Sequence, residues 1–204
     1  MNPRCSLSIA VLLGAALGSA QAQPLPKPSV DYAGSARVSG AQGPVAVRHQ
    51  LGLLRLEGNV QGQPLTVLVD LHQDSATVLT RFQGLPVALD IPPMGQAPIG
   101  MPRYDAIDAE PVGQARVAGE PCTVYRLRGL PGGPKVSGSA CVTGDGILLK
   151  AEGTNPNGQP VRMEMTQVQR APQDPALFQV PPGYQRLQIP ALGALPGLPT
   201  LGQP

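Results

Sequence analysis

The chain has 204 residues, with 15 lysines and arginines against 13 acidic residues. This near balance of charge, without a basic stripe that carries interleaved aromatic residues, excludes a typical nucleic-acid-binding surface. Glycine and proline each occur 25 times, aromatic residues make up 3% of the chain, and there is no tryptophan. Such a composition argues against long helices and favours many short strands joined by frequent turns.

Residues 1–22 have the pattern of a secretory signal peptide. Arg4 supplies a positive charge, Leu7–Leu17 is an apolar run, and Ala20-Gln21-Ala22 is a cleavage site of the small-x-small type. The apolar run is too short to span a bilayer comfortably. We therefore expect cleavage after Ala22 and a periplasmic or secreted protein whose mature chain has no transmembrane segment; an uncleaved anchor is the alternative.

Short strands and tight turns are expected to follow a proline-rich leader at residues 23–29, and residues 30–189 are expected to form a single antiparallel β domain. Around the turn at Asn59–Gly62, antiparallel pairing sets leucines and valines on one face and charged or hydroxyl residues on the other, as in a sheet with one dry and one wet side. The strands predicted in the first half are Tyr32–Val38, Val45–His49, Leu53–Glu57, Leu65–Leu71, Ala76–Phe82 and Val87–Ile91.

Residues 92–112 interrupt this pattern, since they contain five prolines and no alternation of apolar and polar residues. We interpret them as a surface loop; a flap over one face of the sheet is the alternative, because long irregular loops are uncommon and only some are functional. Strands are expected to resume at Gln114.

Cys122 and Cys141 are the only cysteines after the signal peptide, and they flank a turn at Pro131-Gly132-Gly133-Pro134. A hairpin centred on that turn sets the two cysteines directly opposite each other, close enough for a disulfide. Two cysteines in an exported chain most often form one structural disulfide. The Cys-x-x-Cys pattern of thiol-exchange enzymes is absent.

The later strands carry a register that can be followed through two further turns. A two-residue loop at Gly144-Asp145, with positive φ at both residues, sets Ala140 opposite Leu149. A five-residue loop after Thr154 sets Leu149 opposite Met165 and Ala151 opposite Met163. The apolar residues then share one face, while the disulfide lies on the polar face with Arg126, Arg128, Lys150, Glu152, Arg162 and Glu164.

Few residues suggest chemistry. The two histidines, His49 and His72, are on different predicted strands, and Asp70 and Asp74 beside His72 do not complete a metal site. A Gly-x-Ser-x-Gly nucleophile motif is absent. We therefore expect no enzymatic activity, no cofactor and no metal.

The end of the chain is expected to hold a short element at Asp174–Val180 and a last strand at Tyr184–Ile189. Residues 190–204 consist mainly of leucine, proline, glycine and alanine, with no charge and no usable period. We expect a disordered or extended tail there.

Several stretches resemble exported bacterial domains of unknown function that are similar to the LolA/LolB periplasmic lipoprotein carriers. They are Arg55-Leu56-Glu57, Val69-Asp70, residues 118–125, residues 141–147 and Phe178-Gln179-Val180-Pro181-Pro182-Gly183-Tyr184. The resemblance implies a mainly β fold with little helix, in which an antiparallel sheet curls into an incomplete barrel with an apolar concave face. In the carriers that face holds acyl chains under helical lids, and no such lid helix is apparent here.

The leading interpretation is a non-enzymatic periplasmic domain that binds an apolar ligand, an acyl chain or a lipidated protein, on its concave face. The alternative is an envelope structural or protein-interaction module without a small-molecule ligand, which binds a partner through a sheet edge. Apolar alternation alone does not distinguish an open site from a filled core. The candidate lining residues are Leu54, Leu56, Val67, Val69, Ala140, Leu149, Ala151, Met163 and Met165.

Overall fold

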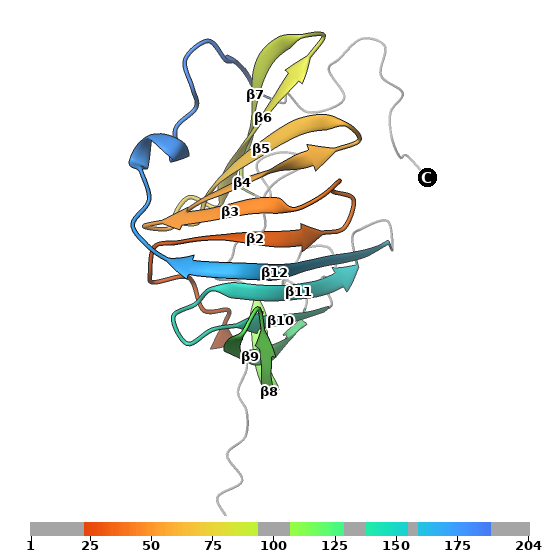
Figure 1. The fold of residues 1–204 in the computed structure, drawn as a ribbon, viewed down its shortest axis with the longest axis vertical. Coiled ribbons are helices and arrows are strands. Elements are labelled where there is room, and N and C mark those ends of the chain that lie inside the picture. Colours follow the sequence, from red (N-terminus) through yellow and green to blue (C-terminus); the bar gives the residue numbers. More distant parts are fainter. Residues whose placement is uncertain (1–22, 94–106, 129–137, 155–158, 189–204) are drawn as a thin grey trace, which may run out of the picture.

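The computed structural model describes residues 23–93, 107–128, 138–154 and 159–188, and in them it forms one 13-stranded sheet (Figure 1). The strand order is β1-β8-β9-β10-β11-β12-β2-β3-β4-β5-β6-β7-β13. All neighbours are antiparallel except β13, which runs parallel to β7. The strands are β1 (Gln23–Pro24), β2 (Tyr32–Val38), β3 (Val45–Gln50), β4 (Leu53–Val60), β5 (Gln63–Asp70), β6 (Ser75–Phe82), β7 (Leu85–Ile91), β8 (Asp108–Val117), β9 (Glu120–Arg128), β10 (Gly138–Val142), β11 (Leu148–Thr154), β12 (Pro160–Arg170) and β13 (Gln185–Gln188).

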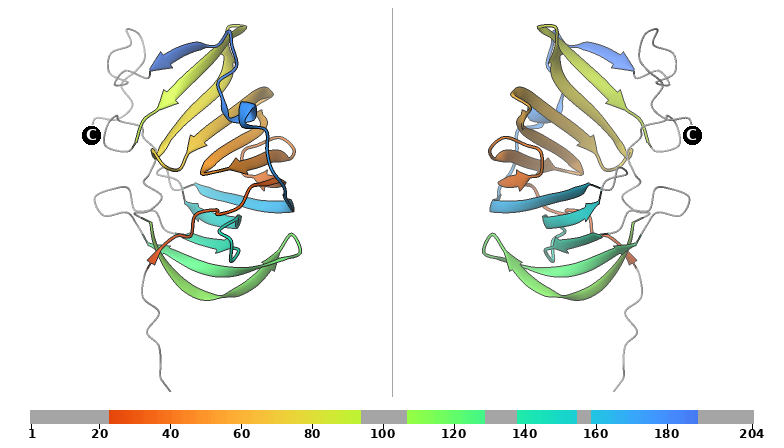
Figure 2. Two further views of the ribbon diagram at one scale, coloured as in Figure 1. Left: turned by 90° about the vertical axis from the view of Figure 1, so that its left-hand side faces the viewer. Right: turned by 90° about the vertical axis from the view of Figure 1, so that its right-hand side faces the viewer.

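The sheet is curled rather than flat, as the side views in Figure 2 show. Val117 and Ala118, at the turn of the β8–β9 hairpin, pack against a cluster that includes Tyr32 and Val47. Five places in the strand order separate β9 from β3, so the sheet must fold over to bring them into one cluster. We call the face with Tyr32 and Val47 the inner face.

The six strands expected in the first half are confirmed, and β2 has the predicted bounds. The mainly β, antiparallel architecture is confirmed as well. Within the described residues the only helix is η2, a single 3-10 turn at Pro175–Phe178, where a short element was expected. β8 begins at Asp108, earlier than Gln114 where strands were expected to resume; residues 94–106 of the expected loop lie outside the described residues.

The turn between β10 and β11 differs from the predicted two-residue loop. Thr143 and Ile147 are hydrogen-bonded across a three-residue loop, and Gly146, at φ 85°, is the residue with positive φ. A turn followed by a left-handed glycine is the common form of three-residue hairpin loop. The register also shifts between Cys141 and Val142, just before this loop, so Ala140 lies opposite Ala151 and the predicted Ala140–Leu149 pair is wrong.

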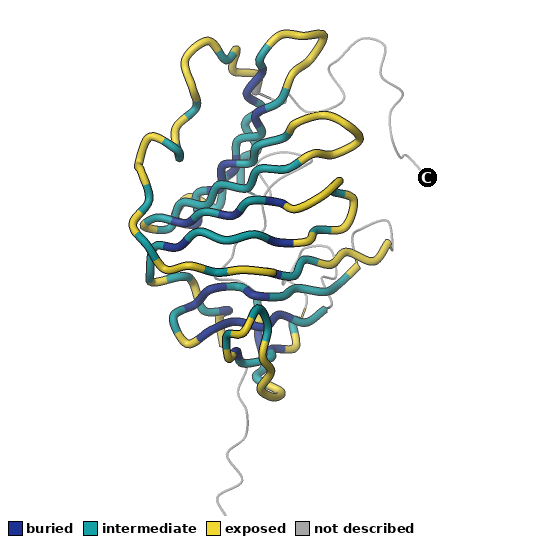
Figure 3. The backbone as a smooth tube through the Cα atoms, viewed as in Figure 1, coloured by how far each residue is buried: buried dark blue, intermediate teal, exposed yellow. Residues whose placement is uncertain are grey.

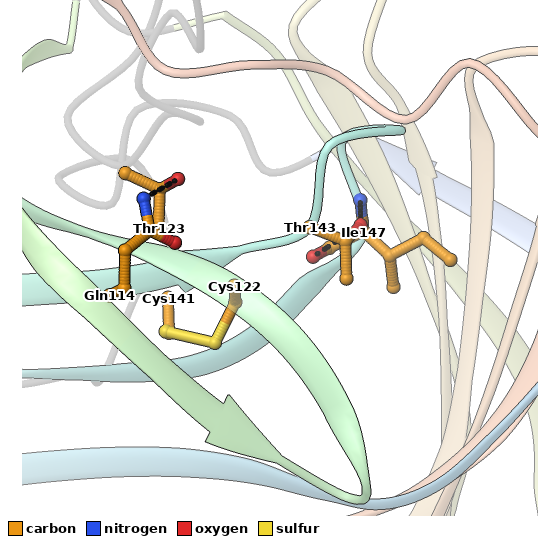
Figure 4. The surroundings of a disulfide bond; sticks show 6 residues. All are labelled: Gln114, Cys122, Thr123, Cys141, Thr143 and Ile147. Carbon is orange, nitrogen blue, oxygen red and sulfur yellow. Dashed lines mark hydrogen bonds between the residues drawn. A yellow bond between two sulfur atoms is a disulfide. The ribbon is translucent and has the colours of Figure 1, made fainter.

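The disulfide between Cys122 and Cys141 is confirmed (Figure 4). Cys141 pairs with Lys150, so the bridge starts from the predicted face, but it is buried in the core there and not solvated. Cys141 pairs with Val124, so the two cysteines are diagonal rather than direct neighbours. Their exposed fractions are 2% and 4%, and they belong to the cluster of Ile147, Leu149 and Met165. The β8–β9 hairpin folds over this region, so the disulfide fills the core there.

The register of β11 against β12 is as predicted. Ala151 lies opposite Met163, and the flanking pairs are Lys150–Glu164 and Glu152–Arg162. Arg162 forms ion pairs with both Glu152 and Glu164. This register keeps the charged side chains of the two strands on the polar face. A slip of one residue would have exchanged the two faces.

Candidate ligand-binding face

An apolar row crosses six neighbouring strands on the inner face. Consecutive antiparallel pairs join Val47 of β3 to residues of β4, β5, β6 and β7, and the parallel pair with β13 adds Leu187. Because directly paired residues project from the same face of a sheet, these side chains form one continuous line. We call it the apolar row: Val47, Leu56, Val67, Val78, Leu89 and Leu187.

The exposure of the apolar row rises along its length. Val47 is 3% exposed, the four side chains of β4 to β7 are half-buried, and Leu187 is 46% exposed. Figure 3 shows mainly intermediate burial along β4 and β5. The end of the row near β3 is thus core, whereas in the described part of the chain its other end is incompletely covered.

The nine candidate lining residues do not form one surface. Leu149, Met165 and Ala140 are at most 2% exposed, and Ala140 packs in a separate cluster with Leu25, Ala109, Tyr125 and Val142. Leu54, Leu56 and Val67 are half-buried and lie with Val69 on the inner face of β4 and β5. Ala151 and Met163 are half-buried and border a smaller cavity of about 280 Å³ near Val38. Only the partly exposed members are accessible for a ligand.

His49 borders the apolar row as a neutral side chain. It is 1% exposed, stacks on Tyr32 and lies opposite Leu54. Its Nδ1 is 2.8 Å from the carbonyl oxygen of Val30, and its Nε2 is 3.0 Å from the amide of Gly52. A carbonyl only accepts and an amide N–H only donates, so Nδ1 carries the proton and Nε2 accepts. Burial lowers the pKa of His49, although the Val30 carbonyl and Asp31 oppose that shift.

The opposite, outer face of β5 to β7 is covered by the C-terminal segment. Val180 and Tyr184 pack against Leu68, Leu79 and Ala88. The segment is held by hydrogen bonds, since Arg55 Nη1 donates to the Leu177 carbonyl at 2.6 Å and Gln50 Nε2 donates to the Gln173 carbonyl at 2.8 Å. Arg55 also pairs with Glu57, whose pKa is lowered mainly by that hydrogen bond. One sheet face therefore has its own cover, which the sequence analysis did not predict.

A cavity of about 680 Å³ lies between this segment and the ends of β4 to β6. Its volume is in the range of small-molecule sites. The sequence analysis did not predict this cavity, because the residues that line it are far apart in the chain and meet only in the folded structure. Its lining is mixed: Leu53, Leu54, Leu68, Val69, Asp70, Gln73, Ser75, Ala76, Thr77, Arg186 and residues 178–184.

The sequence analysis assigned Asp145 only to a turn, whereas the structure gives it further contacts. Arg170 Nε donates to its carboxylate at 2.6 Å, and the same guanidinium reaches Glu120. The Asp145 carbonyl accepts from the Ser29 amide at 2.9 Å. The hydrogen bond from Arg170 is the main cause of the lowered pKa of Asp145. These contacts join the N-terminal segment, β9, the β10–β11 turn and β12.

The described residues offer neither a metal site made by their side chains nor a membrane span made by a helix. They contain no group of three or more His, Cys, Asp or Glu side chains arranged to hold a metal ion. In the same part of the chain, no helix has both the length and the apolar character needed to cross a membrane.

No protein-family model matches the sequence, and no curated protein matches it significantly. Among solved structures, the chain is similar to MucB, with 16% identity, a TM-score of 0.41 and coverage of 78% of this chain and 60% of the other. It is also similar to a chain of the Pseudomonas aeruginosa MucA/MucB complex, at 18% identity and a TM-score of 0.38 over 77% of this chain and 58% of the other. The chain thus spans less than two thirds of these MucB structures.

A LolA superfamily protein from Nitrosomonas europaea matches at 10% identity, with a TM-score of 0.34 and coverage of 77% of this chain and 92% of the other. The structural matches thus include a member of the LolA superfamily, and these three TM-scores are all below 0.5.

Proposed function

We propose that the mature chain is an exported binding protein that holds an apolar ligand, an acyl chain or the acyl group of a lipidated protein, on the inner face of β4 to β7. The observation that carries this proposal is the apolar row, whose side chains on β4 to β7 are half-buried. Burial of such surface by a ligand is favourable in proportion to the apolar area removed from water.

The shape of the row favours a long, narrow ligand. From β4 to β13 it crosses four strand spacings of about 4.8 Å each, or about 19 Å in all. Its members Leu56, Val67, Val78, Leu89 and Leu187 carry no polar atoms in their side chains. A parallel line lies beside the row and contains Leu54, Val69, Ala76 and Ile91, because each of these residues pairs with the next. An unbranched hydrocarbon chain fits this arrangement.

Val78 and its neighbour Thr77 offer a matched test, since they are adjacent on β6 and lie on opposite faces. Val78→Gln should weaken binding of a dansyl-labelled fatty acid about tenfold, because burial of a valine side chain contributes about 1.5 kcal/mol and 1.4 kcal/mol corresponds to a factor of ten. Thr77→Gln, which puts the same side chain on the outer face, should leave the Kd unchanged. Equal affinities for the two variants would argue against a ligand on the inner face.

The alternative, a protein-interaction module, rests on the edge strand β8. β1 pairs only with Asp108 and Ala109, and residues 112–116 of β8 are exposed. An uncovered strand edge can accept a strand from another protein. Native mass spectrometry of gently purified mature protein separates the two functions, because copurified lipid supports the first and a copurified protein supports the second.

A further inference from the structure

The cavity of about 680 Å³ between the C-terminal segment and the ends of β4 to β6 is lined by no residue of the apolar row. Its floor is formed mainly by the outer face, where two lines of directly paired residues lie side by side. Because paired residues project from the same face of a sheet, their side chains offer apolar and polar groups to one space. The two lines are Leu53–Asp70–Ser75 and Leu68–Thr77.

The roof of the cavity consists of residues 178–184, which are held at both ends. Just before them the Leu177 carbonyl accepts a hydrogen bond from Arg55, and just after them β13 pairs with β7. The tail expected at residues 190–204 lies outside the described part of the chain. The two prolines of the roof have a fixed φ, and Gly183 adopts a φ of 88°, which favours glycine. The roof is therefore preorganised, which lowers the entropic cost of binding a ligand.

Two aromatic rings line this cavity, although the chain has few. The sequence contains two phenylalanines, four tyrosines and no tryptophan, and Phe178 and Tyr184 are both lining residues. Each of the two is only half-buried. The face of an aromatic ring attracts cations, and aromatic side chains recurrently enclose quaternary ammonium groups. The rings thus favour a ligand that carries a cationic group.

Asp70 gives the lining a negative charge that points to the same kind of ligand. Its Oδ1 accepts hydrogen bonds from the backbone amides of His72 and Gln73, at 2.8 and 3.0 Å, and in the described part of the chain its carboxylate forms no ion pair. The other charged lining residue, Arg186, pairs with Asp90 at 3.2 Å, so its charge is compensated. A cationic ligand would compensate the charge of Asp70, whereas an anionic ligand would be repelled by it.

We propose that this cavity binds an organic ammonium compound. The Asp70 carboxylate and the rings of Phe178 and Tyr184 hold its cationic group, and Leu53 and Leu68 contact an apolar part of the same molecule. The volume of about 680 Å³ leaves room for such a second part beside the ammonium group. The site does not depend on the acyl ligand of the inner face, because no residue of the apolar row contributes to it.

Choline and its uncharged carbon analogue, in which a tert-butyl group replaces the trimethylammonium group, are matched probes, since they have the same shape. Titration of choline into the mature chain, followed by amide NMR, should shift the signals of Gln73, Ser75 and Thr77. The uncharged analogue should bind about tenfold more weakly. Equal affinity for the two probes would overturn the recognition of a cation, and no shift of these signals with choline would overturn the site.

Two pairs of variants then locate the contacts. Asp70→Asn keeps an Oδ1 for the two backbone amides and should weaken choline binding about tenfold. Its control, Asp74→Asn, removes the same charge from the same turn at a residue that does not line the cavity, and should leave the Kd unchanged. Phe178→Leu should weaken binding about fivefold, whereas Phe82→Leu, at a side chain 64% exposed on another hairpin, should not.

The amide spectrum of each variant shows whether it is folded, and the comparison of the two probes uses the unchanged chain and so does not depend on any variant. Folded Asp70→Asn and Phe178→Leu variants that bind choline as the unchanged chain does would overturn the proposal. Equal losses of affinity in Asp70→Asn and Asp74→Asn would also overturn it, because they would show attraction by net charge without a defined site.

Discussion

The position of the disulfide in the core can be tested with two double variants. Replacing Cys122 and Cys141 by alanine removes a cross-link between residues separated by 19 positions, and the lost loop-closure entropy should lower the free energy of unfolding by about 3 kcal/mol. Replacing both by serine removes the same cross-link but also leaves hydroxyl groups where the exposed fractions are only 2% and 4%.

The surroundings of these hydroxyl groups determine how much further the serine variant is destabilised. They would lie beside Ile147, Leu149 and Met165, whose side chains offer no strong hydrogen-bond acceptor. Burial of a hydroxyl group without a good partner costs about 1–3 kcal/mol, and the double variant has two of them. The serine variant should therefore unfold with a free energy about 5–9 kcal/mol below that of the oxidised chain, in total.

Urea unfolding at pH 7, followed by far-UV circular dichroism, measures both differences. Wild-type protein reduced with dithiothreitol is the control, because it keeps both sulfur atoms and loses only the cross-link. Serine and alanine variants of equal stability would place the disulfide on a solvated face and would refute its burial. An alanine variant as stable as the oxidised chain would refute the cross-link itself.

Three further predictions concern other parts of the chain. His49 has a pKa below its ordinary value because it is buried; the unfolded chain then binds a proton that the folded chain does not, so the free energy of unfolding should fall as the pH drops below about 6.5. This slope should be smaller in His49→Phe, and an unchanged slope would contradict the assignment. Arg55→Met removes a charged donor to the Leu177 carbonyl, so it should lower the free energy of unfolding by about 2 kcal/mol and speed proteolysis within residues 171–184. The control is Arg81→Met, which loses only a local hydrogen bond to the Gly84 carbonyl and should change neither quantity. The intact mass of protein exported from a Gram-negative host should be that of a chain that begins at Gln23, and a mass that includes residues 1–22 would contradict cleavage after Ala22.

The sequence by itself determined where most strands lie and which side chains share a face. Alternation of apolar and polar residues along a strand is a local property with a period of two, so it can be followed without knowing the partner strands. For this reason β2 to β7 and the Ala151–Met163 pair were predicted, and Leu54, Leu56, Val67 and Val69 were assigned to one face. The disulfide was predicted from the number of cysteines that follow the expected signal peptide.

Only the tertiary structure decided which part of that face is core and which part is accessible. One extra residue in the loop after Thr143 and one irregularity beside Cys141 changed the partner of Ala140, and such shifts depend on loop conformation that local alternation does not encode. The curl of the sheet then enclosed Leu149, Met165 and the disulfide, while Leu56, Val67 and Val78 stayed half-buried. Burial depends on contacts between strands that are distant in the sequence, so it is determined only when the whole sheet has curled and these strands are in contact.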